Sequence, residues 1–162
     1  MSTSYKDVMI IMGSKSDWPT MQEAAQVLEE LGVDHHSAVV SAHRTPERMY
    51  EFAREAENNG VKVIIAGAGG AAHLPGMVAA ITHLPVVAVP VKSKFVDGLD
   101  SLLSIAQMPR GVAVATQGVG PMGAYNAGVY ATQILSLTDI NLSKRFKDWR
   151  EARRSTVGWE VE

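Results

Sequence analysis

Short apolar runs alternate with longer amphipathic stretches along the chain. Five runs have the length of strands: residues 8–12, 37–40, 61–66, 86–91 and 112–116. The first of them is apolar throughout and stops at Gly13, which is typical of a strand buried on both faces. In residues 21–31 the apolar side chains instead recur at three- and four-residue steps among glutamates and glutamines, which indicates an amphipathic helix.

A second helix is predicted to begin after Thr45, because a threonine N-cap with Pro46 at the first helical position is a common helix start. Strands that alternate with helices favour a parallel sheet covered on both faces. We therefore predict an α/β fold. Its architecture is a flavodoxin-like three-layer α/β/α sandwich around a five-stranded parallel sheet, with a C-terminal helix.

Two further helices follow the last predicted strand. Residues 123–137 are rich in alanine and glycine, and a helix that is apolar nearly all round is usually buried. On a small domain this indicates a contact between subunits. Residues 139–154 are strongly charged and are predicted to form a solvated surface helix. We expect a single domain over residues 1–162, with its core at 7–137 and a helical tail at 138–162.

Composition and charge narrow the class of protein. The 162 residues include no cysteine, which excludes disulfides and thiolate metal sites, and the formal charge of −2 gives no general attraction to nucleic acid or anionic lipid. The segment Met1–Asp7 lacks the pattern of a secretory leader, and no apolar run reaches the length of a membrane helix. The sequence thus predicts a soluble cytoplasmic protein that binds neither nucleic acid nor membrane.

Candidate chemistry lies in the loops that follow the strands, where open parallel sheets bind their ligands. Gly13, Ser14, Lys15, Ser16 and Asp17 follow the first strand and open a helix. Their hydroxyls and the amides of a helix start can hold an anion such as phosphate. A plain capping turn, with Ser16 or Asp17 as the N-cap, is the alternative. The segment is not a P-loop, because it lacks the second glycine and the Gly-Lys-Ser/Thr ending.

The loop after the second strand contains Ser41, His43 and Arg44, again at a helix start. The helix dipole and the Arg44 guanidinium both disfavour a protonated His43, which favours a neutral imidazole for proton transfer. Arg44 itself suits a phosphate or carboxylate. The alternative is an exposed histidine and a surface arginine without a catalytic role.

The loop after the third strand, residues 66–76, consists almost entirely of glycine and alanine before His73. Such a loop can direct successive backbone amides at a small polar group and leaves room for a flat ligand. Close packing of a helix on a strand would demand the same small residues, and His73 would then have a structural role. No spacing of histidines and carboxylates is diagnostic of a metal site, so we predict none and no cofactor.

Taken in order, four motifs resemble the N5-carboxyaminoimidazole ribonucleotide mutase family of purine biosynthesis over residues 8–150. They are Met-Gly-Ser-Lys-Ser-Asp at 12–17, Ser-Ala-His-Arg-Thr-Pro at 41–46, Gly-Ala-Gly-Gly-Ala-Ala-His-Leu-Pro-Gly at 67–76 and Ser-Ile-Ala-Gln-Met-Pro-Arg-Gly at 104–111. Residues 117–124 depart from the family pattern, whereas the Asn-Ala-Gly at 126–128 fits it.

The resemblance implies a reaction in which the carboxylate on the exocyclic nitrogen of the ribonucleotide moves to carbon 4 by decarboxylation and recarboxylation, in the synthesis of IMP. It implies that His43 is the single general acid/base and that the backbone amides of residues 67–72 bind CO2. It also implies a substrate site formed by Ser14, Ser16, Asp17, Ser41, Arg44, Gly69, Gly70, Ala71 and His73.

The family resemblance further implies a homo-octamer, in which Gln107, Met108 and Pro109 of a neighbouring subunit help to close each site. It also suggests functional coupling to N5-carboxyaminoimidazole ribonucleotide synthetase. Two alternatives remain at this stage. One is an aminoimidazole ribonucleotide carboxylase that uses CO2 directly, and the other is a non-catalytic flavodoxin-like binding module. The second would need an acidic cluster after the first strand or aromatic residues for a flavin, and only 6% of the chain is aromatic.

Overall fold

The computed structural model describes residues 5–161, so that residues 1–4 of the Met1–Asp7 segment and residue 162 lie outside it. The strands are β1 (Val8–Met12), β2 (His35–Val39), β3 (Val63–Gly69), β4 (Val86–Val91) and β5 (Ala115–Thr116). The helices are α1 (Trp18–Glu30), α2 (Pro46–Glu55), α3 (Leu74–Ala79), α4 (Leu99–Ala106), α5 (Pro121–Leu135) and α6 (Ile140–Ser155). A short 3-10 turn, Lys15–Asp17, precedes α1.

The five strands form one parallel sheet in the order β2-β1-β3-β4-β5. The chain leaves β1 to one side to form β2 and then returns to the other side to form β3. This reversal is the point at which ligands bind in open parallel sheets, beyond the carboxyl ends of the strands. The predicted flavodoxin-like architecture is confirmed.

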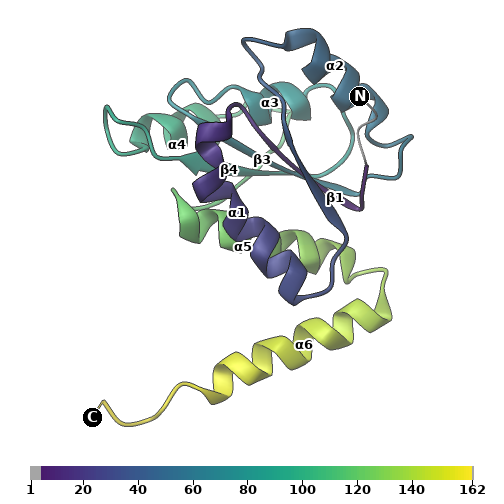
Figure 1. Cartoon of the computed structure of the whole chain (residues 1–162), viewed down its shortest axis with the longest axis vertical. Coiled ribbons are helices and arrows are strands. Elements are labelled where there is room, and N and C mark those ends of the chain that lie inside the picture. Colours follow the sequence, from purple (N-terminus) through teal and green to yellow (C-terminus); the bar gives the residue numbers. More distant parts are fainter. Residues whose placement is uncertain (1–4, 162) are drawn as a thin grey trace.

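Helices α1 and α5 cover one face of the sheet, and α2, α3 and α4 cover the other (Figure 1). Successive side chains of a strand point to opposite faces, so β1 serves both layers. Val8, Ile10 and Met12 belong to the cluster under α1 and α5, whereas Met9 and Ile11 belong to the cluster under α2 and α3. Because all five are buried, this strand anchors the loop that follows it.

The small residues of α5, expected at a contact between subunits, instead face α1 of the same chain. A Cβ added to Gly128 would lie 2.4 Å from Val27 Cγ1 and 2.8 Å from the Ala24 carbonyl oxygen. Ala127 and Ala131 beside it are fully buried. These small residues therefore allow two helices of one chain to approach closely, whereas Met122 and Tyr130 at other positions of α5 remain exposed.

Several element boundaries differ from those predicted. β2 begins at His35 rather than at residue 37, and β5 is reduced to Ala115–Thr116. Both are edge strands that pair with one neighbour only. The helices α3 and α4 were not predicted from the sequence. α3 has only six residues and includes a proline and a glycine, which hides its helical periodicity.

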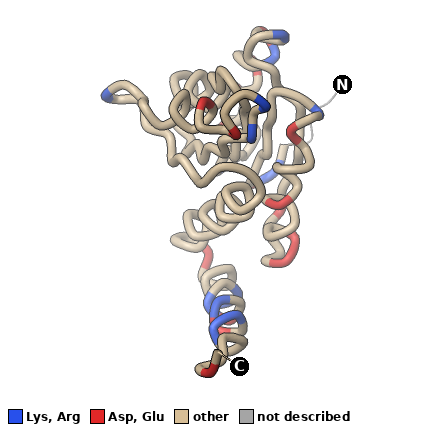
Figure 2. Tube along the Cα trace, turned by 90° about the vertical axis from the view of Figure 1, so that its left-hand side faces the viewer, with Lys and Arg blue, Asp and Glu red and all other residues tan. Residues whose placement is uncertain are grey.

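Helix α6 extends beyond the layer formed by α1 and α5 and carries many of the chain's lysines and arginines (Figures 1 and 2). Leu142 and Phe146 are buried in the cluster under α1 and α5. Trp149 Nε1 and Arg153 Nη2 donate hydrogen bonds of 3.2 and 3.0 Å to Glu30 at the end of α1. α6 is therefore held by both apolar and polar contacts. No helix in the described part of the chain is both long and apolar enough to cross a membrane.

Candidate active site

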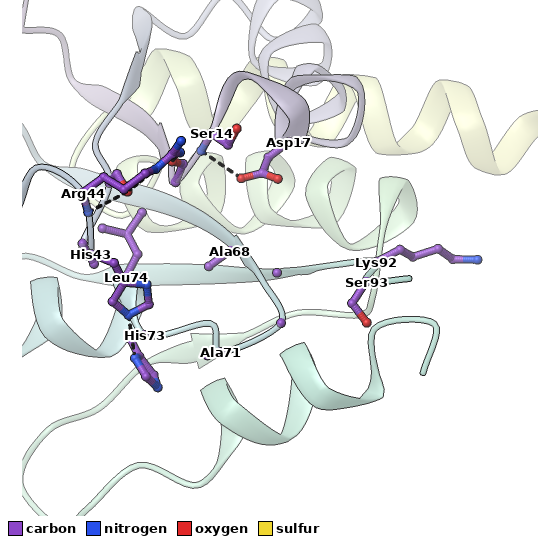
Figure 3. A pocket seen from close by; sticks show the side chains of 15 residues that line it. Ser14, Asp17, His43, Arg44, Ala68, Ala71, His73, Leu74, Lys92 and Ser93 are labelled. Atoms are coloured by element: carbon purple, nitrogen blue, oxygen red, sulfur yellow. Dashed lines mark hydrogen bonds between the residues drawn. The ribbon is translucent and has the colours of Figure 1, made fainter. Parts of the chain in front are cut away.

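A pocket of about 410 Å³ lies at the carboxyl edge of the sheet (Figure 3). The loops after β1, β2, β3 and β4 all contribute to it. Its lining residues are Gly13, Ser14, Asp17, Ser41, Ala42, His43, Arg44, Ala68, Gly69, Gly70, Ala71, His73, Leu74, Lys92 and Ser93. The three loops singled out from the sequence thus meet in one cavity, because they follow three adjacent strands.

The loop after β1 is held by a capping box. Ser14 caps the 3-10 turn, since its Oγ accepts from the Ser16 amide at 3.3 Å. Asp17 is the N-cap residue of α1, as one alternative expected, but its side chain makes no capping hydrogen bond to that helix. The Asp17 carboxylate accepts from the Ser14 amide at 3.1 Å. The Ser16 hydroxyl donates to Ser14 Oγ at 2.9 Å and lies outside the pocket lining. Ser16 therefore contacts Ser14 but does not itself line the pocket.

Asp17 is half-buried, and its ionisation reflects that position. Burial raises the pKa of the Asp17 carboxyl above its ordinary value of 3.8. The hydrogen bonds from Ser14 and Ser16 and the charge of Arg44 act in the opposite direction, but burial has the larger effect. Polar hydroxyl groups of a ligand would supply the hydrogen bonds that this carboxylate lacks.

Arg44 connects the loops after β1 and β2. Its Nη2 donates to the Gly13 carbonyl oxygen at 2.7 Å, and its Nε lies 3.4 Å from Ser41 Oγ. Thr45 Oγ1 accepts from the Ser41 amide at 3.1 Å and donates to the Ser41 carbonyl at 3.0 Å. Thr45 is the N-cap of α2 as predicted, but its side chain closes this loop instead of capping the helix. One edge of the guanidinium is thus fixed by the protein, and no hydrogen bond of Nη1 is found within residues 5–161.

His43 and His73 meet at the side of the pocket. Nε2 of His43 lies 2.8 Å from Nδ1 of His73, and the two rings are nearly perpendicular (Figure 3). Both side chains are exposed in the single chain. On the sequence alone, the two histidines are treated separately. The structure shows a directly bonded pair that this chain alone does not shield from water.

The bare loop after β3, which consists almost entirely of glycine and alanine, lines another part of the pocket. Gly70 adopts a φ of +66°, a left-handed conformation that favours glycine. Its amide donates to Ser101 Oγ at 2.9 Å and so cannot also bind a ligand. In the described part of the chain, no hydrogen-bond partner is found for the Ala71 and Ala72 amides. Ala71 lines the pocket, so its amide is available to a ligand, whereas the Gly70 amide is not and Ala72 is buried outside the lining.

Four predicted site residues lie outside the pocket of the single chain. They are Ser16, Gln107, Met108 and Pro109. Met108 packs against Gly76 of its own chain, since a Cβ added there would lie 3.0 Å from its sulfur. Lys92 and Ser93 line the pocket and were not predicted, because the sequence after β4 has no distinctive pattern.

The pocket has the groups needed to bind an anionic, hydroxyl-bearing molecule and to move a proton. Within residues 5–161, no group of three or more histidine, aspartate or glutamate side chains is arranged to hold a metal ion. Among the described residues that line the pocket there is no tyrosine, tryptophan or phenylalanine for stacking a large ring system. The arrangement suits acid–base chemistry on a small polar ligand.

This fold and pocket define a flavodoxin-like α/β protein with a polar pocket at the carboxyl edge of its sheet. The family model described as AIR carboxylase matches residues 7–156, and the chain belongs to that family. It is 58% identical over 150 residues to the N5-carboxyaminoimidazole ribonucleotide mutase of Haemophilus influenzae, a match covering 93% of this chain and 92% of the relative. The mutase of Bacillus subtilis is 59% identical, with 93% of each chain covered.

The similarity extends to solved structures. A crystal structure of Treponema denticola PurE superposes with a TM-score of 0.82 and covers 91% of each chain at 29% identity. The same architecture is therefore maintained at about half the sequence identity found for the bacterial mutases.

Proposed function

We propose that this chain is an N5-carboxyaminoimidazole ribonucleotide mutase of purine biosynthesis. The reaction is an isomerisation that transfers a carboxylate from the exocyclic nitrogen of the substrate to carbon 4 of its imidazole ring. The observation that carries the proposal is the identity of 55–59% with proteins of that name across 93% of this chain. Each main polar group of the pocket can be given a role in this reaction.

The ribose phosphate portion would bind at the loops after β1 and β2. Ser14, with support from Ser16, and the free edge of Arg44 suit the phosphate, because hydroxyls and a guanidinium both donate hydrogen bonds to its oxygens. The Asp17 carboxylate suits the ribose hydroxyls, which can donate to it. Ser41 positions Arg44 through its hydroxyl.

His43 would move the single proton that the reaction requires. When the bond between nitrogen and the carboxylate breaks, its electron pair stays on nitrogen, which takes a proton from the protonated imidazole of His43 and leaves that ring neutral. Carbon 4 then attacks the released CO2, and the imidazole recovers a proton from that carbon. The proton count balances, so one acid–base group is sufficient. No hydrogen-bond partner is found for Nδ1 of His43 in the described part of the chain, which leaves this atom for the substrate.

CO2 would remain beside the bare loop between the two steps. Gly69, Gly70 and Ala71 line the pocket and present almost no side chain. The Ala71 amide, for which no partner is found in the described part of the chain, can donate to a carboxylate or to polarised CO2. Retention of CO2 favours recarboxylation over loss to water.

We further infer a homo-oligomer, with an octamer as the expected state. Its support is the exposed apolar surface, including Phe95 (88% exposed), Leu99, Leu103 and Met122. The exposed His43–His73 pair also leaves a place for a neighbouring subunit to close the site, for which the 107–109 loop is the candidate. Light scattering should give a mass several times 17.4 kDa, and Leu103→Glu should lower it. An active monomer would contradict this inference.

The substrate is a carbamate, and carbamates readily lose CO2 in water. We therefore expect this enzyme to work beside the cytoplasmic N5-carboxyaminoimidazole ribonucleotide synthetase that forms its substrate. Mixing the two purified enzymes should give more product per substrate consumed than adding the same substrate from free solution. Equal yields would contradict functional coupling.

The decisive experiment compares two substrates. The purified protein is given either the N5-carboxylated ribonucleotide or free aminoimidazole ribonucleotide with bicarbonate, and the formation of the carbon-4 carboxylate is followed by absorbance. A mutase turns over the first efficiently and the second poorly. The opposite preference would identify the CO2-using carboxylase. A yellow protein with bound flavin and no turnover of either substrate would identify a binding module.

A further inference from the structure

The loop that would hold CO2 has almost no side chains of its own, so another part of the chain must fix its shape. Ser101, in the first turn of α4, is fully buried although its side chain is polar. Its hydroxyl donates to the Val91 carbonyl at 2.7 Å and accepts from the Gly70 amide at 2.9 Å. This one hydroxyl connects the end of β4 to the loop after β3.

A second serine of α4 contacts the same loop. Ser104 Oγ lies 3.2 Å from the Gly70 carbonyl oxygen, but also 2.7 Å from the Asp100 carbonyl. A hydroxyl has only one proton, so the shorter contact competes with the longer one. Ser101 is therefore the stronger of the two contacts between α4 and Gly70.

The position of Ser101 is itself fixed. Asp100 Oδ1 accepts from the Ser101 amide at 2.9 Å and from the Ser93 hydroxyl at 2.7 Å, and Ser93 lines the pocket. Both partners of the Ser101 hydroxyl are backbone groups at the ends of adjacent strands. The geometry of these two hydrogen bonds thus fixes the distance between the end of β4 and the loop after β3.

We propose that Ser101 is a positioning residue that fixes the CO2-holding loop and so prevents CO2 from escaping between the two half-reactions. The inference rests on the proposed mutase function. The left-handed conformation of Gly70 orients the next peptide, which carries the Ala71 amide. Without the Ser101 hydroxyl, the Gly70 amide lacks its partner and becomes a competing donor, while the loop is free to move.

The test measures the fate of the carboxylate rather than the rate. The N5-carboxylated substrate is labelled with ¹³C in its carboxylate and converted in unlabelled bicarbonate buffer, and the ¹³C content of the product is read by NMR after subtraction of the enzyme-free loss. The wild-type protein should retain the label. Ser101→Ala should lose a large part of it, with a fall in kcat of about tenfold, as expected for one lost hydrogen bond.

Two further variants separate positioning from general stability. Ser101→Cys keeps the volume but replaces the hydroxyl by a weak donor and acceptor, so it should also lose label and decides the matter if Ser101→Ala does not fold. Thr132→Val removes another fully buried hydroxyl, which donates to the Gly128 carbonyl at 2.9 Å on the far layer. This control should retain the label.

The outcomes separate this inference from the proposed function. If the wild-type protein forms no product from the N5-carboxylated substrate, the mutase function fails. If it forms product but Ser101→Ala and Ser101→Cys retain label as well as the wild type, the role of Ser101 is refuted. Loss of label in Thr132→Val to the same extent, or in the wild type itself, would refute it equally.

Discussion

Nε2 of His43 and Nδ1 of His73 lie 2.8 Å apart, although the residues are separated by 30 positions in the chain. Between two neutral imidazoles, one nitrogen donates the proton and the other accepts it. When His73 donates, neutral His43 carries its proton on Nδ1, and that atom cannot accept another. When His43 donates, its Nδ1 is a base. The contact therefore relates the tautomer of one ring to the catalytic state of the other.

Replacement of His43 by asparagine removes the proposed acid–base group while leaving the phosphate-binding side untouched. We expect kcat to fall by about 10²–10⁴-fold, the usual contribution of a positioned acid or base. Calorimetric binding of the product should change little, because Ser14, Asp17 and Arg44 are intact. A variant with kcat within about tenfold of the wild type would show that another group moves the proton.

His73→Phe keeps a ring at this position but removes the hydrogen bond to His43. We expect kcat to fall by about tenfold with little change in KM, because the variant alters the tautomer balance of His43 and not its presence. The ¹⁵N NMR shifts of the His43 ring should report the change in tautomer directly. His83→Phe, at an exposed histidine outside the pocket, is the matched control and should show wild-type values for both.

Asp17→Asn separates the contribution of this residue to binding from its effect on stability. Burial raises the pKa of Asp17, so its ionised form is less favourable in the folded chain than in the unfolded one. Between 3.8 and the raised pKa, the folded state therefore gains stability as the pH falls, and at pH 7 the charge opposes folding. We expect an unchanged or higher Tm in calorimetry at pH 7 and a KM about tenfold higher.

The same pKa predicts how the wild-type enzyme responds to acid. As the pH falls toward the raised pKa, Asp17 becomes protonated and KM should rise at a higher pH than for an ordinary aspartate. Asp17→Asn should lack this rise. A large loss of Tm in the variant at pH 7 would mean that the carboxylate stabilises the fold instead.

Glu30→Gln tests the contact that holds α6. Burial acts to raise the pKa of Glu30, but hydrogen bonds from Trp149, Arg153 and Tyr125 outweigh it and lower the pKa below its usual 4.5. A lowered pKa gives stability that is present above 4.5 and is lost as the pH falls through the folded value. We expect the variant to lose about 1 kcal/mol in urea unfolding at pH 7.

The difference between Glu30→Gln and the wild type should shrink in acid, because the wild-type carboxylate is then protonated too. Glu29→Gln is the control, since its side chain is exposed and its carboxylate lies 3.9 Å from His35 Nε2. If both variants behave alike at pH 7, the contacts of Glu30 with α6 add nothing to stability.

The sequence predicts two of the three inner strands to the residue, whereas β3, expected at residues 61–66, spans Val63–Gly69. β1 and β4 are predicted to the residue because they are apolar on both faces, and only a two-sided core explains such a run. The edge strand β2 begins with His35, His36 and Ser37 and has no such apolar run. Its start was therefore predicted two residues too late. The packing of Gly128 against α1 could not be predicted, because an apolar pattern shows that a face is covered but not which surface covers it.

A similar distinction applies to the pocket. Loops with unusual residues, such as the pair His43–Arg44, follow strands, and the topology of a parallel sheet then predicts that they meet. Ser101 has no signal in the sequence, since one serine in a helix resembles any other. Its role arises only from the approach of α4 to Gly70 in space, across 31 positions of the chain.

The division of the pocket between the two halves of the chain affects how it forms during synthesis. The N-terminal half of the chain leaves the ribosome first, and it contains every residue named above as lining the pocket except Lys92 and Ser93. β3, which carries the bare loop, still lacks its neighbour β4 at that stage, and Gly70 lacks its partner on α4. While α4 is still inside the ribosome, the nascent chain therefore contains His43, His73 and Arg44 but not the complete pocket around them.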